Sequence, residues 1–275
     1  MKPRLQRRVQ RYGWDKASPL YERCWALPLQ PAQVRLTELA KLVPGERVLD
    51  VACGTGLVTF PAGVTVGSSG YVLGADLSAR MVDVVRSEAK RRGMVQVEAL
   101  RMDAEDLTLP DASFDATLCA LGLMYVPDPD TALAEMSRVL RPGGRVAVAV
   151  WGHHTQCGWA EIFPIMDARV ASEVCPMFFE LGTADSLRAA MIRAGFEDVS
   201  VERFHTHLPY ATDDDALQAA FAAGPVALAY SRFDDATRDS AHTEYLASIE
   251  EYRNGEGYRI PGEFVLAAGR KPLAR

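Results

Sequence analysis

One turn in the sequence combines residue types that bind nucleotide-like ligands. The stretch RVLDVACGTGLVTF (47–60) places Asp50 at the end of an apolar run, and Gly54 and Gly56 follow in the adjoining turn. Glycine adopts positive φ angles and allows a ligand to approach the backbone closely. The spacing therefore predicts a strand, a ligand-binding turn and a helix.

Two further apolar runs also end in acids. Asp76 ends the run YVLGAD, and the sequence DAEDL places Asp103, Ala104 and Glu105 at the end of a third run. An acid at the end of the second strand accepts hydrogen bonds from both ribose hydroxyls of a bound nucleoside. Asp103 or Glu105 could accept from an adenine amino group, with the Ala104 backbone beside the ring. These positions predict a nucleoside site.

The residues of this turn favour one class of cofactor over another. A dinucleotide site needs free backbone N–H groups at a helix N-terminus and has the pattern G-x-G-x-x-G. Here the third glycine position is Thr59, and the carboxylate of Asp50 would repel a pyrophosphate. S-adenosylmethionine carries an ammonium and a sulfonium and no phosphate, so it suits an acid at this point. An NAD(P)-dependent oxidoreductase is the disfavoured alternative.

Regularly alternating elements position these acids. Apolar runs alternate with helix-like segments, as in parallel βαβ units covered on both faces. The expected strands are 47–52, 71–76, 95–103, 114–121, 144–151, 199–204 and 262–271. The order predicts an α/β, doubly wound, mostly parallel seven-stranded sheet of the Rossmann-like kind.

Helix signals support this order. One helix is expected from the cap Ser78 to Gly93, a second stops at Pro142-Gly143, and a third ends at Gly195. We expect a single domain over 1–275, divided as follows: an N-terminal lid, 1–33; a core of sheet and helices, 34–204 and 258–271; and a helical insertion, 205–257.

Four stretches together resemble class I S-adenosylmethionine-dependent methyltransferases. They are VLDVACGTG, GADLSARMV, DAEDLTLPDASFD and EMSRVLRPGGRVAVAV, and their pattern is most similar to the ubiquinone/menaquinone-biosynthesis-like set, the methyltransferase type 11 subgroup. The resemblance covers 45–205 well. Together these motifs are specific for the family, whereas a single G-x-G turn would be weak evidence for it.

The resemblance implies a seven-stranded sheet whose last strand is antiparallel. It also implies cofactor contacts from Asp50, Gly54, Gly56, Asp76, Asp103 and Ala104. We extend this prediction to neighbouring positions on the same strand ends: Ala52, Leu77, Met81, Glu105, Ala120 and Leu121. The cofactor expected is S-adenosylmethionine, and no metal is expected.

The loop after the fourth strand departs from the quinone methyltransferases that the sequence resembles. Their stretch is similar to FGLRNV, whereas this chain has LGLMYV, with Met124 and Tyr125 in place of an Arg-Asn pair. A charged, hydrogen-bonding pair has become an apolar and an amphipathic residue. The departure argues against a quinol substrate and leaves methyl transfer intact.

Methyl transfer depends mainly on proximity, alignment and a dry pocket, so it imposes no fixed side-chain motif. An oxygen nucleophile also needs its proton removed. The candidate catalytic residues are His153 and His154, after the fifth strand, and Tyr125. The candidates for an apolar substrate pocket are Tyr12, Trp14, Trp25, Met124, Trp159 and Phe163.

Composition limits the remaining possibilities. The chain has 275 residues, 48% hydrophobic and 24% charged, with a formal net charge of −6, which disfavours a broad nucleic-acid surface. No apolar run reaches membrane-spanning length. The five cysteines are scattered and form no C-x-x-C pair, which favours reduced thiols and a cytoplasmic location.

These observations predict a small-molecule methyltransferase. The acceptor is expected to be partly apolar or aromatic and to be methylated at O, N or C. A non-catalytic S-adenosylmethionine-binding or regulatory protein is the main alternative, because it would keep the same cofactor motifs. RNA methylation is disfavoured by the acidic balance, and the sequence does not determine the oligomeric state.

Overall fold

The protein is built on one mixed β-sheet. The computed structural model describes residues 3–171, 175 and 177–274, so residues 1, 2, 172–174, 176 and 275 of the predicted domain lie outside the described residues. The strands are β1 (Arg47–Val51), β2 (Tyr71–Asp76), β3 (Val97–Arg101), β4 (Phe114–Ala120), β5 (Leu140–Trp151), β6 (Glu197–Tyr210), β7 (Arg253–Asn254) and β8 (Gly257–Arg270).

The strand order is β3-β2-β1-β4-β5-β8-β6, and the short β7 pairs with β8. The first five strands run parallel, and β8 lies antiparallel between β5 and β6. The predicted mostly parallel sheet with an antiparallel last strand is confirmed.

Strand register brings the acids to one edge of the sheet. Asp50 pairs with Gly74, two residues before Asp76, and Asp76 pairs with Arg101, two residues before Asp103. The central strands are buried along most of their length, as continuous apolar runs require. The carboxyl ends of β1, β2 and β3 therefore meet at the same place.

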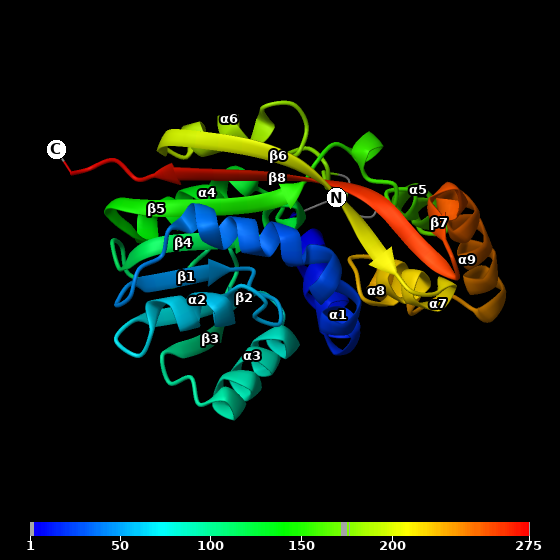
Figure 1. Cartoon of the computed structure of the whole chain (residues 1–275), viewed down its shortest axis with the longest axis horizontal. Helices are drawn as coiled ribbons and strands as arrows, with labels where there is room; N and C mark the ends of the chain where they lie inside the picture. Colours follow the sequence, from blue (N-terminus) through cyan, green and yellow to red (C-terminus); the bar gives the residue numbers. More distant parts are fainter. Residues whose placement is uncertain (1–2, 172–174, 176, 275) are drawn as a thin grey trace.

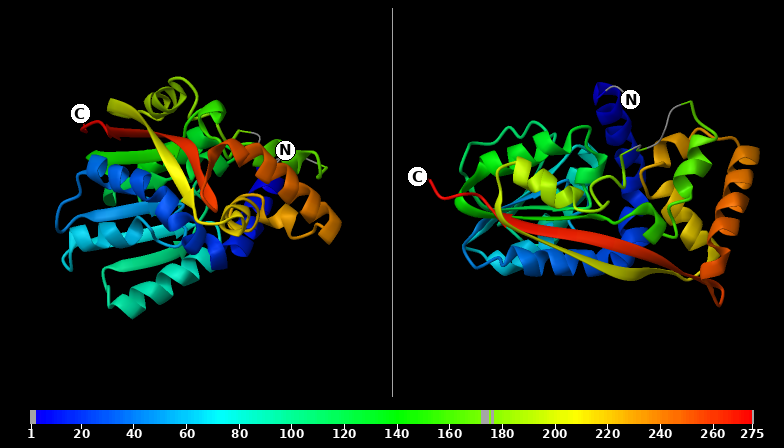
Figure 2. Two further views of the ribbon diagram at one scale, coloured as in Figure 1. Left: turned by 45° about the vertical axis from the view of Figure 1, so that its right-hand side comes forward. Right: turned by 90° about the horizontal axis from the view of Figure 1, so that it is seen from above.

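Helices cover both faces of this sheet. They are α2 (Thr59–Val66), α3 (Ala79–Arg92), α4 (Pro129–Val139) and α6 (Ser186–Arg193). The cap predicted at Ser78 forms, since its hydroxyl accepts from the Met81 N–H at 3.1 Å, and Gly93 ends α3 at φ 66°. Figures 1 and 2 show α2 on one face and α4 on the other.

The N-terminal segment is one long helix, α1 (Pro3–Ala40), which continues past the predicted lid boundary at 33. It includes Pro19, Pro28 and Pro31, residues that interrupt the backbone hydrogen-bond ladder and favour bends. Figure 1 shows α1 change direction, with one half over the sheet and the other over the strand ends. A single element thus joins the core to the predicted lid.

Three strands are longer than the sequence predicted. β5 begins at Leu140, so α4 ends at Val139, before the stop expected at Pro142-Gly143. β6 and β8 pair continuously from Phe204–Phe264 out to Tyr210–Tyr258, so residues 205–210 are strand and not part of a helical insertion. The pair reaches past the sheet toward a group of short helices (Figure 2). They are α5 (Ile162–Asp167), α7 (Asp213–Leu217), the π-helical turn η3 (Gln218–Ala222), α8 (Ala227–Tyr230) and α9 (Asp235–Ile249).

Three short 3-10 turns complete the chain: η1 (Leu123–Tyr125), η2 (His154–Gln156) and η4 (Glu250–Tyr252). All five cysteines are buried and free. Within residues 3–171, 175 and 177–274, no helix is long and apolar enough to cross a membrane, and no three His, Cys, Asp or Glu side chains gather as a metal site would require.

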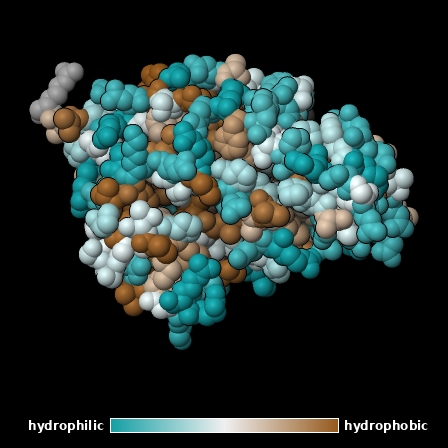
Figure 3. All heavy atoms as spheres, viewed as in Figure 1, coloured by the Kyte–Doolittle hydropathy of each residue, from teal (hydrophilic) through white to brown (hydrophobic). Residues whose placement is uncertain are grey.

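The surface differs between the two ends of the molecule. In Figure 3 apolar side chains gather where α1 passes α2, and the end that carries α9 is largely polar. Leu27 and Val34 of α1 are among the exposed apolar residues. This patch lies on the outer side of α1, away from the strand ends.

Candidate functional site

A pocket of about 780 Å³, including its mouth, lies at the carboxyl ends of the strands and is covered by α1. We call it the cofactor pocket. Its walls from the sheet side are Val51, Ala52, Gly54, Ala75, Asp76, Leu77, Met81, Met102, Asp103, Ala104, Ala120, Leu121, Gly122, Tyr125, Val126 and Pro127. Its walls from α1 are Arg7, Gln10, Trp14 and Tyr21.

The turn after β1 forms one side of the pocket and has a strained backbone. Gly54 has φ 55° and Gly56 φ 93°, but Ala52 also has φ 56°, which costs a residue with a Cβ about 1–2 kcal/mol. A Cβ on Gly56 would lie 2.6 Å from the Phe60 ring. Gly56 is therefore required for packing against α2 and does not line the pocket, unlike Ala52 and Gly54.

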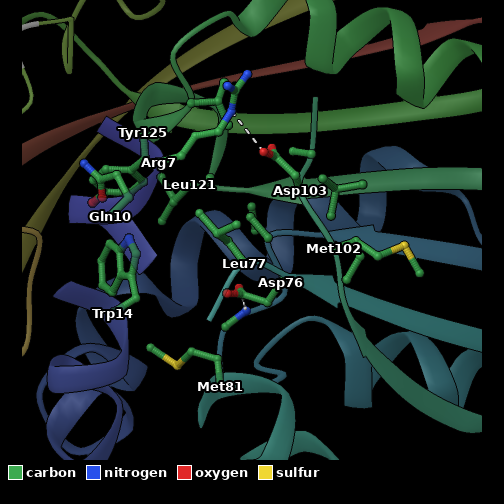
Figure 4. Close-up of a pocket in the computed structure, with 18 of the residues that line it drawn as sticks. Arg7, Gln10, Trp14, Asp76, Leu77, Met81, Met102, Asp103, Leu121 and Tyr125 are labelled. Atoms are coloured by element: carbon green, nitrogen blue, oxygen red, sulfur yellow. Dashed lines mark hydrogen bonds and ion pairs between the residues drawn. The ribbon is translucent and has the colours of Figure 1, made fainter. Parts of the chain in front are cut away.

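Asp76 is held rigidly at the pocket wall (Figure 4). Its two carboxylate oxygens accept hydrogen bonds from the Gly54 N–H at 2.9 Å and the Ser78 N–H at 2.8 Å. Burial raises the pKa of Asp76 to about 6, and the two backbone donors counteract that rise. The carboxylate is mainly ionised near neutrality, in a fixed orientation that leaves lone pairs for ligand hydroxyls.

Asp50 has a different position from the one its sequence context suggested. It is buried and does not line the pocket, and its carboxylate accepts from the Thr59 hydroxyl at 2.6 Å. Burial raises the pKa of Asp50 to about 7. This hydrogen bond links the end of β1 to the start of α2. Because Asp50 does not reach the pocket, the structure does not support a direct contact between its carboxylate and a ligand ammonium.

Arg7 of α1 bridges the two acids that follow β3. Its Nε lies 2.8 Å from a Glu105 oxygen and 3.0 Å from an Asp103 oxygen (Figure 4 shows the Asp103 side). Asp103 lines the pocket, whereas Glu105 lies behind it as the buried partner of Arg7. The sequence predicted that both acids contact the cofactor; of the two, Asp103 lines the pocket, together with Ala104.

Further hydrogen bonds hold the same half of α1 over the pocket. Asp15 accepts from the Ser78 hydroxyl at 2.6 Å and from the Arg80 N–H at 3.2 Å, at the N-terminus of α3, where negative charge is favourable. Gln6 donates to the Tyr125 carbonyl at 3.4 Å. The first half of α1 is thus fixed to β3, α3 and the loop after β4.

Sequence analysis missed Arg7, Gln10 and Tyr21 as pocket residues. Their signal is helical spacing: together with Trp14 and Trp25 they recur at intervals of three, four or seven residues, which places them on one face of a helix. Val51, Ala75, Met102, Gly122, Val126 and Pro127 were also missed. These six had no signal beyond nearness to the strand ends.

The chemistry of this lining fits a nucleoside with a positive charge. Among the described lining residues the charged side chains are Asp76, Asp103 and Arg7. Arg7 is already paired with two carboxylates, so it offers no free cation to a phosphate. Apolar side chains from Leu77, Met81 and Met102 supply faces for a planar base (Figure 4). A sulfonium cofactor with a ribose meets these conditions better than a pyrophosphate.

Comparisons with known proteins agree with this geometry. Residues 49–148 match the family described as methyltransferase domain. The chain is 38% identical over 135 residues to aklanonic acid methyltransferase of Streptomyces sp. (strain C5), which covers 49% of this chain and 61% of that protein. It is 34% identical over 154 residues to demethylmenaquinone methyltransferase of Listeria welshimeri, which covers 54% and 65%.

The chain is thus similar to methyltransferases over its residues 49–148. It spans about two thirds or less of the length of these curated relatives. The fold also superposes on phosphoethanolamine N-methyltransferase 2 of Haemonchus contortus, solved with S-adenosylhomocysteine, with a TM-score of 0.62 at 17% identity over 94% of this chain and 58% of that one.

Next to the cofactor pocket lies a second cavity, of about 340 Å³ including its open side. Trp14, Tyr21, Leu121 and Tyr125 line both spaces. The other walls are Trp25, Leu29, Trp151, Trp159, Phe178, Gly224 and Pro225. We call it the aromatic cavity, because ring edges and faces make up most of its lining.

Ring contacts hold the aromatic cavity together. Trp14 and Tyr125 meet edge to face at 5.0 Å between centroids, and Trp151 and Trp159 at 4.8 Å. Tyr125 and Phe178 lie 5.3 Å apart. Such pairs stabilise a protein by about 0.5–1.5 kcal/mol beyond their buried area. The rings therefore form a stiff wall around the space that adjoins the cofactor pocket.

The predicted substrate-pocket residues divide into two groups. Trp14, Trp25 and Trp159 line the aromatic cavity, and Phe163 packs behind it against the Trp159 ring at 5.9 Å. Met124 is buried without lining either space, and Tyr12 is exposed. Tyr12 faces outward because α1 turns it away from the face that carries Trp14 and Tyr21.

The predicted bases lie outside both spaces. His153 caps η2, since its ring Nδ1 accepts from the Thr155 backbone N–H at 3.3 Å, and its own backbone N–H donates to the Glu263 carboxylate. His154 lies beside the Phe179 ring. Tyr125 does line both spaces, but burial raises its pKa well above the usual value, so the phenol stays protonated near neutrality. Its position suits a wall and not a general base.

Proposed function

We propose that this chain is an S-adenosylmethionine-dependent methyltransferase whose acceptor is a small, partly apolar or aromatic molecule. The observation that carries the proposal is the pair of adjoining spaces. One has the acids and apolar faces that a nucleoside with a positive charge requires, and the other is aromatic. Trp14, Tyr21, Leu121 and Tyr125 separate them.

Residues of the cofactor pocket have distinct parts in this proposal. When bound, S-adenosylmethionine supplies a methyl group activated by a positively charged sulfur. Asp76 would accept hydrogen bonds from the ribose hydroxyls, and Leu77, Met81 and Met102 would pack on the base. The family resemblance of the turn supports contacts by Ala52 and Gly54, where the backbone approaches the pocket.

The shared wall would organise the transfer. Aromatic faces attract a cation, and Trp14, Tyr21 and Tyr125 present three rings at the junction. They also exclude water from the reacting atoms. Burial and the nearby charge of Asp76 raise the pKa of Tyr21 above its usual value, so this phenol also stays neutral.

The aromatic cavity favours an acceptor that needs no protein base. Its described lining contains no His, Asp, Glu or Lys side chain. The acceptor would form the bond to the methyl carbon with a lone pair on O or N, or with the π electrons of an enol carbon, while the electrons of the carbon–sulfur bond remain on sulfur. The proton that the methylated acceptor then loses would pass to water. An acceptor that is nucleophilic at neutral pH meets this requirement at O, N or C.

Two measurements test the proposal. Isothermal titration should show binding of S-adenosylmethionine and S-adenosylhomocysteine and none of NADH or NADPH. Incubation with S-adenosylmethionine and a panel of aromatic phenols, amines and enolic ketones should then produce S-adenosylhomocysteine. Tight NADH binding without S-adenosylhomocysteine binding would refute the assignment. Cofactor binding with no turnover on any acceptor would favour a non-catalytic binding protein.

A further inference from the structure

The aromatic cavity has two hydrogen-bond donors without a partner. The indole Nε1 atoms of Trp25 and Trp159 are buried and find no acceptor in the described part of the chain. Trp25 is 8% exposed and Trp159 is 6% exposed, and the centroids of their rings lie 6.4 Å apart. Both residues line the cavity.

An unpaired buried donor is costly. A buried N–H without an acceptor loses about 1–3 kcal/mol, so buried tryptophans usually find a partner. Two such indoles in one cavity constitute an unsatisfied feature that an apolar packing role does not explain. An oxygen atom of a molecule inside the cavity would relieve it, since an indole donates and never accepts.

We propose that the aromatic cavity binds a planar aromatic acceptor that carries a carbonyl oxygen, and that Trp25 and Trp159 donate to this oxygen. This inference rests on the proposed function, because it assigns the methyl acceptor to the space beyond Trp14 and Tyr125. The ring walls select a flat apolar body. The indole pair selects the oxygen and fixes which end of the molecule enters first.

The lining also limits the charge of the acceptor. Among the described residues the walls of the aromatic cavity carry no charged side chain. A carboxylate or ammonium placed there would lose its hydration without a countercharge, which is far more costly than burying a carbonyl. The acceptor body is therefore uncharged where it contacts Trp25 and Trp159.

A matched pair of probes tests this inference. The protein is first saturated with S-adenosylhomocysteine, whose binding is measured separately, and is then titrated with 2-acetylnaphthalene or 2-ethylnaphthalene while tryptophan fluorescence is followed. The two probes have a similar shape, and only the first has a carbonyl. The carbonyl makes 2-acetylnaphthalene less hydrophobic than 2-ethylnaphthalene, so hydrophobic burial alone would favour the second probe. We expect 2-acetylnaphthalene to bind about tenfold more tightly, which would report a hydrogen bond to its carbonyl.

Three variants locate the effect. Trp25→Phe and Trp159→Phe keep an aromatic ring and remove one N–H each, so each should weaken 2-acetylnaphthalene binding several-fold and leave 2-ethylnaphthalene binding within twofold. Phe178→Leu removes a ring from the same cavity without removing a donor, so it should weaken both probes equally. Circular dichroism confirms that each variant is folded.

The outcomes separate the inference from the proposed function. If S-adenosylhomocysteine binds and the wild-type protein prefers 2-ethylnaphthalene, or binds both probes equally, the indole pair does not recognise a carbonyl. The same conclusion follows if folded Trp→Phe variants keep the wild-type preference. If S-adenosylhomocysteine itself does not bind, the proposed function fails before the acceptor is considered.

Discussion

Arg7→Ala should loosen the first half of α1 over the cofactor pocket. The Arg7 guanidinium is the partner of Glu105, whose side chain is only 2% exposed, and it also contacts Asp103. Removing it leaves the Glu105 carboxylate buried and unpaired in the covered state. When α1 lifts away, water reaches that carboxylate, so the substitution favours the open state.

The expected size follows from the burial of the pair. Breaking a fully buried ion pair costs about 3–5 kcal/mol. Arg7 is 34% exposed, so solvent already screens the interaction, and about 1–2 kcal/mol is appropriate. This corresponds to an opening equilibrium raised about 5- to 30-fold. Burial raises the pKa of Glu105, so the effect shrinks as the pH falls and the carboxyl takes up a proton.

Hydrogen exchange measures this opening directly. Amides within 3–18 should exchange about 5- to 30-fold faster in Arg7→Ala than in the wild type, and the difference should shrink as the pH is lowered. Arg8→Ala is the matched control, because Arg8 is the exposed neighbour on the same helix. Adding Glu105→Gln to Arg7→Ala removes the buried charge and should restore most of the protection.

Equal exchange in the Arg7 and Arg8 variants would refute this reasoning. The contacts of Asp15 with α3 would then suffice to hold the helix in place. Faster exchange that Glu105→Gln does not reverse would also contradict it, since the cause would be lost packing of the Arg7 side chain and not an unpaired carboxylate.

Further predictions concern the wall that faces α1. Asp76→Ala should weaken S-adenosylhomocysteine binding by about 1–3 kcal/mol in isothermal titration, because the ribose hydroxyls lose their acceptor; an unchanged dissociation constant would assign them to another residue. Since ligand hydroxyls favour the charged carboxylate and the pKa of Asp76 is about 6, wild-type affinity should be constant above pH 7 and fall toward about tenfold per unit below pH 6; a flat titration from pH 7 to 5 would contradict this role. Ala52→Gly should relieve the left-handed strain at φ 56° and stabilise the fold by about 0.5–1 kcal/mol, or about 2 °C in thermal unfolding, and a lower melting temperature would show that the methyl packing matters more. Gly54→Val should abolish S-adenosylhomocysteine binding in a folded protein, because a β-branched residue is poorly tolerated at φ 55°, whereas normal affinity would remove the turn from the site.

Local patterns predicted the sheet and one wall of the site well. Continuous apolar runs place the strands because a buried parallel strand requires them, and the cap at Ser78 and the stop at Gly93 act within a few residues of themselves. The acids at the ends of β2 and β3 follow from parallel topology alone. Asp76, Asp103 and Ala104 could therefore be assigned to the pocket without coordinates.

The same patterns could not predict the partners of buried polar groups. The sequence context of Asp50 predicted a contact with the cofactor. Its carboxylate instead accepts a hydrogen bond from Thr59, nine positions away, because the turn folds α2 back over the end of β1. Glu105 was a predicted acceptor for the adenine amino group. Its carboxylate instead binds Arg7 of α1, which lies 98 positions earlier in the chain. Which donor satisfies a buried acid depends on packing between elements.

By itself, the sequence determined the sheet and the acids and glycines that lie at its strand ends, because short-range apolar runs, caps and glycine turns encode those features. Only the tertiary structure decided what covers that site. The aromatic cavity takes its walls from α1, the loop after β4, the end of β5 with the segment that follows it to Phe178, and the turn at Gly224, and these four regions lie far apart in the sequence. Ring packing over such distances follows from how the elements dock, which no local pattern specifies.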